Sequence, residues 1–224
     1  EVVTQMIYGE SFSISQKKNK WLKIKIKEDN YKGYIQNKNY SKYIKSTHKI
    51  NKLNAKIYKF FNKQVKINEL TFGSRIKVIN KKFQFYEFAR GWINKEDVSA
   101  ISVKEKNYFK KINIFKNIRY KWGGKSFKGI DCSALIQVCL NFNNIFCPRD
   151  ARDQVKYFKK NIKLNKIKKN DIIYWKGHVA VALNNKKLIH AYGPMKKTVI
   201  MGIHQTIRRI NETANLKVIG IKRL

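Results

Sequence analysis

A cysteine stands at the start of a predicted buried helix in the stretch GIDCSALIQVCLNF, residues 129–142. The apolar side chains behind it follow the i, i+3, i+4, i+7 spacing of a helix: Leu135, Val138, Cys139 and Phe142. The Gly-containing turn before Cys132 places its sulfur at the helix N-terminus. Unpaired N–H groups and the positive end of the helix dipole there favour the thiolate, the nucleophilic form of cysteine. A backbone N–H at this place can also stabilise an oxyanion.

Such a nucleophile needs a base, and the chain contains four histidines: His48, His178, His190 and His204. His178 begins an alternating strand at residues 177–183, and His190 lies in the next strand at residues 187–192. A single strand histidine is usually structural. Two on adjacent strands, together with a cysteine at a helix start, favour a Cys-His-His constellation. Strand parity places Ala180 and Ala182 on the face of His178, where their small side chains would let the cysteine helix approach.

The connection between these strands decides whether the two histidines can meet. Asn184-Asn185 is a strong signal for a two-residue turn, which would put His178 opposite Ala191 and turn His190 to the other face. Placing His178 directly opposite His190 requires an odd number of loop residues. We therefore predict a three-residue loop (183–185), a five-residue loop (182–186) or a bulge.

The first hundred residues contain an internal repeat. The segment YGESFSI at residues 8–14 resembles FGSRIKV at residues 72–78, and each copy then reaches an alternating strand. Both copies close on Gly-aromatic-Ile, at residues 33–35 and 91–93. Short alternating strands between glycines and polar turns predict two small antiparallel barrels. In the first, alternation with one bulge puts three side chains in a common core: Trp21, Ile24 and Ile26.

The composition is strongly basic. Lys and Arg number 50 against 14 Asp and Glu, for a net charge of +36. The lysines are scattered over every segment among Asn and Ile, which favours a compositional bias. A non-specific attraction for polyanions is the alternative. We expect no dedicated nucleic-acid partner and no membrane span, because no apolar stretch approaches roughly 18 residues.

The cysteines indicate neither a disulfide framework nor a metal site. The chain has an odd number of cysteines, namely Cys132, Cys139 and Cys147, and no histidine is spaced like a zinc ligand. We therefore expect no metal or cofactor. Sparse thiols fit the reducing cytoplasm. Because the first residue is Glu1, a removed signal peptide and a secreted or envelope location form the alternative.

The order of motifs closely resembles the NlpC/P60 cysteine peptidases. The matching segments are Tyr-x-Trp-Gly-Gly to Asp-Cys-Ser-x-Leu at residues 120–135, Pro-Arg-Asp at 148–150, residues 171–180 with Gly-His-Val, and Leu-Ile-His-Ala at 188–191. The Gly-aromatic-Ile endings resemble bacterial SH3 domains. The resemblance implies an α+β fold, with a papain-like catalytic domain at residues 101–224 behind two small SH3-like β-barrels at residues 1–46 and 47–100. Alignment of the two copies predicts that the first barrel is N-terminally incomplete, because it lacks an opening strand that the second has. Either the sequence is truncated before Glu1 or that barrel is completed differently.

The resemblance also implies residue roles. Cys132 is the nucleophile, His178 the general base and His190 the residue that orients it, while Tyr120 lies near the oxyanion site. The free amino end of the substrate is contacted by a further set: Asp131, Ser133, Asp150, and in the first barrel Glu10, with Tyr31 as a weaker match. The chain departs from the family at Ala134, usually Gly, and at Ala151, often Ser, whose missing hydroxyl affects fine specificity.

The function implied is a cysteine endopeptidase that resembles the γ-D-glutamyl-diamino-acid endopeptidases of muropeptide recycling. Its substrates would be peptidoglycan-derived peptides with a free N-terminal L-Ala, positioned by the SH3 domains. The alternative is a catalytically inactive protein that binds the cell wall or polyanions. Such a protein would usually have lost a catalytic residue, whereas the chain retains Cys132, His178 and His190.

Overall fold

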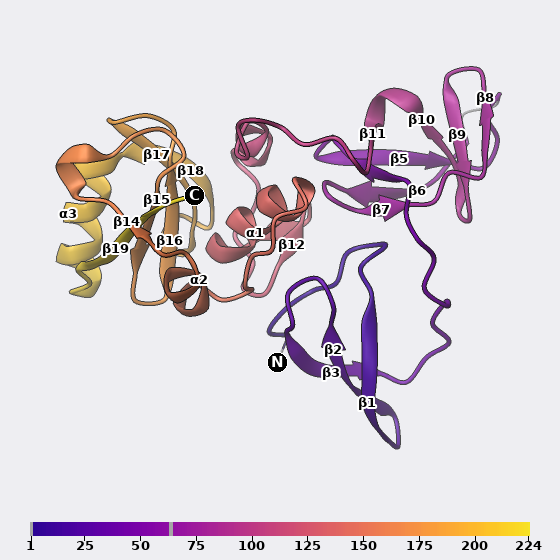
Figure 1. Cartoon of the computed structure of the whole chain (residues 1–224), viewed down its shortest axis with the longest axis horizontal. Coiled ribbons are helices and arrows are strands. Elements are labelled where there is room, and N and C mark those ends of the chain that lie inside the picture. The colour runs from indigo at the N-terminus through magenta and orange to yellow at the C-terminus, as the bar shows by residue number, and fades with distance from the viewer. Residues whose placement is uncertain (1, 63–64) are drawn as a thin grey trace. The chain divides into compact units, whose positions relative to one another are not determined.

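The computed structural model describes residues 2–62 and 65–224 and divides them into two compact units. One unit is Met6–Val103, and the other joins Lys104–Leu224 to the N-terminal residues up to Gln5 (Figure 1). The predicted boundaries at residues 46 and 100 stay predictions. None of the helices in the described part of the chain has the length and apolar character needed to span a membrane.

The first predicted barrel contains a three-stranded antiparallel sheet of β1 (Phe12–Lys18), β2 (Trp21–Ile26) and β3 (Lys32–Gln36). Its core is formed by Leu22, Ile24 and Ile26, which are 2–3% exposed. The prediction that Trp21 joins this core is wrong, because Trp21 is 49% exposed. The bulge lies in β1, between Ile14 and Gln16, so β2 alternates strictly and Trp21 faces outward.

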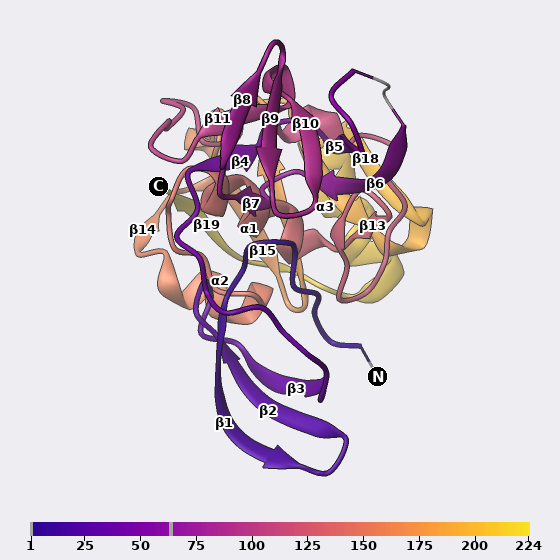
Figure 2. The same cartoon turned by 90° about the vertical axis from the view of Figure 1, so that its right-hand side faces the viewer.

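The second predicted barrel is built from two sheets. The five-stranded sheet has the order β6 (Lys66–Thr71), β5 (Asn54–Tyr58), β10 (Gly91–Asn94), β9 (Phe85–Phe88) and β8 (Asn80–Lys82). The three-stranded sheet has the order β11 (Val98–Ala100), β4 (His48–Ile50) and β7 (Arg75–Ile76), with the 3-10 helix η1 (Lys95–Asp97) before β11 (Figure 2). Both sheets contribute to one apolar core, for example through Ile57 and Ile50.

The unit that contains Lys104–Leu224 is built on a six-stranded antiparallel sheet. Its order is β14 (Lys160–Asn161), β19 (Val218–Arg223), β15 (Ile172–Trp175), β16 (His178–Ala182), β17 (Lys187–Tyr192) and β18 (Lys197–Gly202). The helices are α1 (Cys132–Phe142), α2 (Ala151–Tyr157) and α3 (Ile203–Ala214). Shorter elements are the pair β12 (Lys125–Ser126) and β13 (Gly129–Ile130), and the 3-10 helices η2 (Ile112–Phe115), η3 (Leu164–Lys166) and η4 (Gly193–Met195). The α+β fold class is confirmed.

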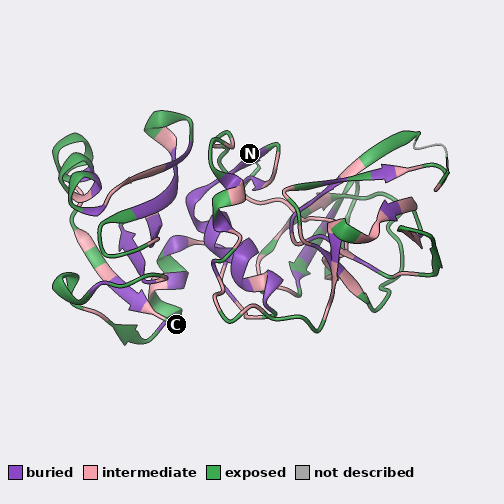
Figure 3. Ribbon diagram, turned by 90° about the horizontal axis from the view of Figure 1, so that it is seen from above, coloured by how far each residue is buried: buried purple, intermediate pink, exposed green. Residues whose placement is uncertain are grey.

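Helix α1 packs against β16 and β17 and is almost entirely buried (Figure 3). Helix α3 lies on the other side of the sheet in Figure 1. Ala180 and Ala182 belong to the core cluster that contains Ile203 and Ile210 of α3. The two alanines therefore contribute to the core on the side of α3, and the expectation that they make room for the cysteine helix stays a prediction.

Candidate active site

The nucleophile candidate is the first residue of α1. Asp131 caps the helix, since its Oδ1 accepts the Ala134 N–H at 2.8 Å. Cys132 is 5% exposed, and its sulfur accepts backbone N–H groups from Val179 of β16 and from Ser133. The sulfur therefore lies where the N-terminus of α1 meets the start of β16, directly after His178.

Burial decides the protonation state of this sulfur. Loss of solvent raises the pKa of the Cys132 thiol to about 12, and the charge of Asp131 acts in the same direction. The pKa is lowered by the N–H groups of Val179 and Ser133 and by the charge of Arg149, but these effects are smaller than the effect of burial. The N–H groups at the helix start thus favour the thiolate, as expected, but burial outweighs them, so the neutral thiol dominates in the free protein at neutral pH.

This protonation state predicts the pH dependence of alkylation. Because the thiolate is the reactive form, the rate constant for iodoacetamide modification of Cys132 should rise about tenfold per pH unit between roughly pH 7 and pH 10. An ordinary thiol would level off within this range. Mass spectrometry of quenched samples measures the rate, and Cys132→Ala identifies label on the other cysteines. A plateau with its midpoint below about pH 7 would show a thiolate–imidazolium pair in the free protein instead.

The two histidines form one hydrogen-bonded pair. A tight turn at Lys176-Gly177, with Gly177 at φ +74°, sets His178 opposite Trp175 at the start of β16. His178 Nε2 lies 2.8 Å from His190 Nδ1. Burial lowers the pKa of His178 to about 4, and burial together with His178 lowers that of His190 to about 2. Both imidazoles are therefore neutral at neutral pH, and His178 can accept a proton.

The predicted odd-numbered loop is confirmed. Val181 pairs with Ile189, and the Leu183 N–H donates to the Lys187 carbonyl at 2.8 Å, which leaves Asn184 to Lys186 as a three-residue loop. The observed loop lies one residue later in the chain than the predicted loop at 183–185. Because of this shift, His190 lies diagonally across from His178 instead of directly opposite it. The side chain of Asn184 accepts the N–H groups of Lys186 and Lys187, both at 2.8 Å. This Asx geometry stabilises the loop.

Tyr120 reaches the same region through the Trp-Gly-Gly turn. A Cβ on Gly124 would lie 2.5 Å from the Gly129 carbonyl oxygen, so only glycine lets these two backbone segments approach. The turn brings Tyr120 beside Ile130, two residues before Cys132. Burial, with the charges of Cys132 and Asp131, raises the pKa of the Tyr120 phenol well above its ordinary value. Tyr120 is therefore a neutral donor close to the sulfur, and its role at the oxyanion site stays a prediction.

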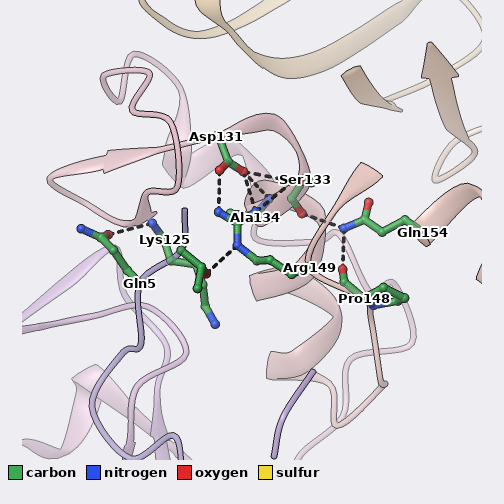
Figure 4. A network of polar contacts seen from close by, with 9 residues as sticks. Gln5, Lys125, Asp131, Ser133, Ala134, Pro148, Arg149 and Gln154 are labelled. Atoms are coloured by element: carbon green, nitrogen blue, oxygen red, sulfur yellow. Dashed lines mark hydrogen bonds and ion pairs between the residues drawn. The ribbon is translucent and has the colours of Figure 1, made fainter. Parts of the chain in front are cut away.

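Asp131 and Ser133 belong to a buried network that the sequence analysis did not anticipate (Figure 4). Its centre is Arg149, whose two terminal nitrogens donate to the two carboxylate oxygens of Asp131, and of which Nη1 also donates to Ser133 Oγ at 2.9 Å. Arg149 Nε donates to Thr4 Oγ1 at 2.8 Å. Arg149 lies inside the Pro-Arg-Asp motif, which was the available signal. The predicted substrate contacts of Asp131 and Ser133 stay predictions.

The other three predicted substrate-binding residues, Asp150, Glu10 and Tyr31, lie outside the hydrogen-bond network around Arg149 described above. Asp150 precedes α2, is half-buried and does not cap the helix with its side chain, and burial raises the pKa of its carboxyl. Glu10 and Tyr31 belong to the unit Met6–Val103. There, Glu10 Oε2 accepts the Ile7 N–H at 2.9 Å, and Tyr31 packs against the Leu22 cluster. Their part in the active site stays a prediction.

No group of three or more His, Cys, Asp or Glu side chains that could hold a metal ion occurs in the described ranges 2–62 and 65–224. The chemistry available from the residues present is that of a buried thiol, a neutral histidine pair and convergent N–H donors. This set is suited to nucleophilic attack on a carbonyl carbon and to stabilisation of the oxyanion.

Family models match two segments of the chain. Residues 117–213 match the NlpC/P60 family, and residues 1–39 match the bacterial dipeptidyl-peptidase Sh3 domain. The chain is 39% identical over 72 residues to dipeptidyl-peptidase 6 of Lysinibacillus sphaericus, which covers 32% of this chain and 27% of that protein. It is 23% identical to the gamma-D-glutamyl-L-lysine dipeptidyl-peptidase of Bacillus subtilis (strain 168), which covers 92% of this chain and 77% of that protein.

Solved structures share the fold. An NlpC/P60 family protein from Bacillus cereus superimposes with a TM-score of 0.81 at 20% identity, covering 98% of this chain and 81% of that one. NlpC2 from Trichomonas vaginalis reaches a TM-score of 0.50 at 17% identity, covering 95% and 83%. The predicted fold is thereby confirmed over nearly the whole chain.

Proposed function

This chain carries an NlpC/P60 cysteine peptidase domain behind a bacterial SH3 domain, and from that premise we propose that it hydrolyses γ-D-glutamyl–diamino acid bonds in peptidoglycan-derived peptides. The observation that carries the chemistry is Cys132 at the start of α1, with its sulfur facing the Val179 N–H beside the hydrogen-bonded pair His178–His190. The bond is supported by the name of the Bacillus subtilis relative, which aligns with 92% of this chain.

The neutral resting state implies general-base attack. His178 accepts the thiol proton while the Cys132 sulfur forms its bond to the amide carbonyl carbon, and the carbonyl π electrons move onto oxygen. N–H groups near the helix start and the Tyr120 hydroxyl are the proposed donors to that oxygen. The intermediate then collapses, the C–N bond breaks, and His178 returns the proton to the leaving amine.

Water completes the cycle. His178 removes a proton from water as the oxygen attacks the thioester, and the Cys132 sulfur leaves and is reprotonated. His190 holds His178 in place through the 2.8 Å contact between their rings. The opposing hypothesis of an inactive binding protein is disfavoured, because each group that this sequence of steps requires is present.

The test is hydrolysis of L-Ala-γ-D-Glu-meso-diaminopimelate, with L-Ala-γ-D-Glu-L-Lys and an N-acetylated peptide in parallel. Liquid chromatography should show release of the diamino acid from a peptide with a free amine. Cleavage of free-amine peptides alone would support action on recycled fragments in the cytoplasm, whereas equal cleavage of the acetylated peptide would indicate wall hydrolysis. No cleavage of any of them would refute the proposed function.

Glu10 is the proposed partner of the substrate ammonium from the first barrel. Glu10→Gln should raise KM for free-amine peptides by about 10- to 150-fold, since a charge-assisted hydrogen bond contributes about 1.5–3 kcal/mol. Steady-state kinetics with free and acetylated peptides measure the effect, and the acetylated peptide should be unaffected. Glu96→Gln, at a carboxylate whose side chain is 78% exposed, is the matched control. Unchanged kinetics in Glu10→Gln would remove the first barrel from substrate recognition.

A further inference from the structure

Each of the two ring nitrogens of His190 faces one polar atom of a neighbouring side chain. His190 is fully buried, with Nδ1 at 2.8 Å from His178 Nε2 and Nε2 at 3.4 Å from the Met201 sulfur. Tyr192 stacks on the imidazole with ring centroids 4.7 Å apart and an angle of 13° between the planes. The stacked tyrosine fixes the plane of the ring, so its edges can exchange partners only by a full flip.

The chemistry of these two partners determines where His190 carries its proton. A neutral imidazole has one N–H and one lone pair, whereas a thioether sulfur can only accept. Placing the proton on Nε2 gives a weak N–H···S hydrogen bond and leaves the Nδ1 lone pair for His178. The opposite tautomer would point a lone pair at the sulfur and leave a buried nitrogen without a donor.

The tautomer of His190 in turn sets that of His178. If His190 Nδ1 accepts, then His178 must donate from Nε2, and its own lone pair is on Nδ1. If His190 donated instead, the proton of His178 would move to Nδ1, and the ring would lose the lone pair that a base needs on that edge. The orientation of one hydrogen bond thus separates a base-competent pair from an inactive one.

We propose that Met201, in β18, is a positioning residue that holds the histidine pair in its base-competent tautomer by accepting the His190 Nε2 hydrogen. This inference rests on the proposed function for its kinetic consequence, but not for the tautomer itself. Met201 lies opposite Leu188 in the β17–β18 ladder. This register places the Met201 sulfur at the edge of the His190 ring that faces away from His178. The sulfur therefore acts on catalysis through two rings without touching the substrate.

Three substitutions separate acceptor chemistry from packing. Met201→Leu removes the acceptor at similar volume, and kcat should fall about 3- to 10-fold with KM unchanged, the loss corresponding to one weak hydrogen bond. Met201→Glu retains an acceptor at this partly exposed position and should keep kcat within about twofold of the wild type. Met195→Leu, the same change at a methionine in η4 that is 37% exposed, is the matched control and should leave kcat unchanged.

The decisive readout is the histidine tautomer, which does not depend on turnover. Nitrogen-15 NMR of histidine-labelled protein should show His190 protonated at Nε2 in the wild type and in Met201→Glu, and a mixture of tautomers in Met201→Leu. A wild-type proton on Nδ1 would overturn the proposal. So would a Met201→Leu variant whose His190 tautomer is unchanged, even if its kcat falls, since the role would then be packing alone. The expected tautomers in a protein without peptidase activity would support the assignment and refute only the proposed function.

Discussion

Cys132→Ala is expected to abolish hydrolysis of γ-D-glutamyl peptides, with a loss in kcat of at least about 10³-fold, because a nucleophile, its base and the residue that orients it act as a unit. The fold should survive the change. Alanine is the best helix former at the first position of α1, and the Asp131 cap bonds to the backbone of Ala134, which the substitution leaves in place. Chromatographic detection of the released diamino acid and a thermal melt of the same preparation measure both effects.

The other two cysteines are matched controls. Cys139 and Cys147 are 1% and 0% exposed, and Cys139 lies two helical turns along α1. Cys139→Ala and Cys147→Ala should lose some stability from the small cavities but retain kcat. Residual turnover by Cys132→Ala near the wild-type rate would show that its sulfur is not the nucleophile. Loss of kcat in a folded Cys139→Ala would show that core packing, and not Cys132 alone, limits the reaction.

Local signals in the sequence were sufficient to predict the arrangement of the catalytic elements. Cys132 begins α1 as predicted, because the apolar spacing behind it and the turn before it both mark the same boundary. The parity argument predicted a three-residue loop, a five-residue loop or a bulge against a strong two-residue turn signal, because an even-numbered loop would put His178 and His190 on opposite faces. The structure has a three-residue loop. Both inferences concern residues that are close together in the sequence, and the geometry of a helix start or of a hairpin can be predicted from such residues alone.

The features that could not be predicted depend on tertiary burial or on partners far away in the sequence. Trp21 and Leu22 both fit an alternating strand, and the position of the bulge in β1 decided which one is buried. The raised pKa of Cys132 comes from packing against β16, which opposes the helix dipole. Met201 carries no motif, and its role depends on the register of β18 against β17.

Arg149→Met is expected to lower the free energy of unfolding by about 3–5 kcal/mol, the cost of leaving a buried carboxylate without its ion-pair partner. The Arg149 and Asp131 side chains are 1% and 6% exposed, so water cannot replace the lost guanidinium. The Asp131 charge also adjoins the nucleophile, whose pKa Arg149 now lowers. The variant should therefore react more slowly with iodoacetamide as well, and urea denaturation together with alkylation rates measures both effects.

Two comparisons assign this loss to the buried charge instead of to the missing side chain. Arg152→Met removes a cation whose side chain is 77% exposed and which lies 3.7 Å from Asp153, so the unfolding free energy should change by at most about 1 kcal/mol. Combining Arg149→Met with Asp131→Asn removes both charges, and asparagine still caps α1. The double variant should be more stable than Arg149→Met alone, because no buried charge is left unpaired. If it is less stable, Arg149 acts through its packing and its bonds to Ser133 and Thr4, and Asp131 is not the source of the penalty.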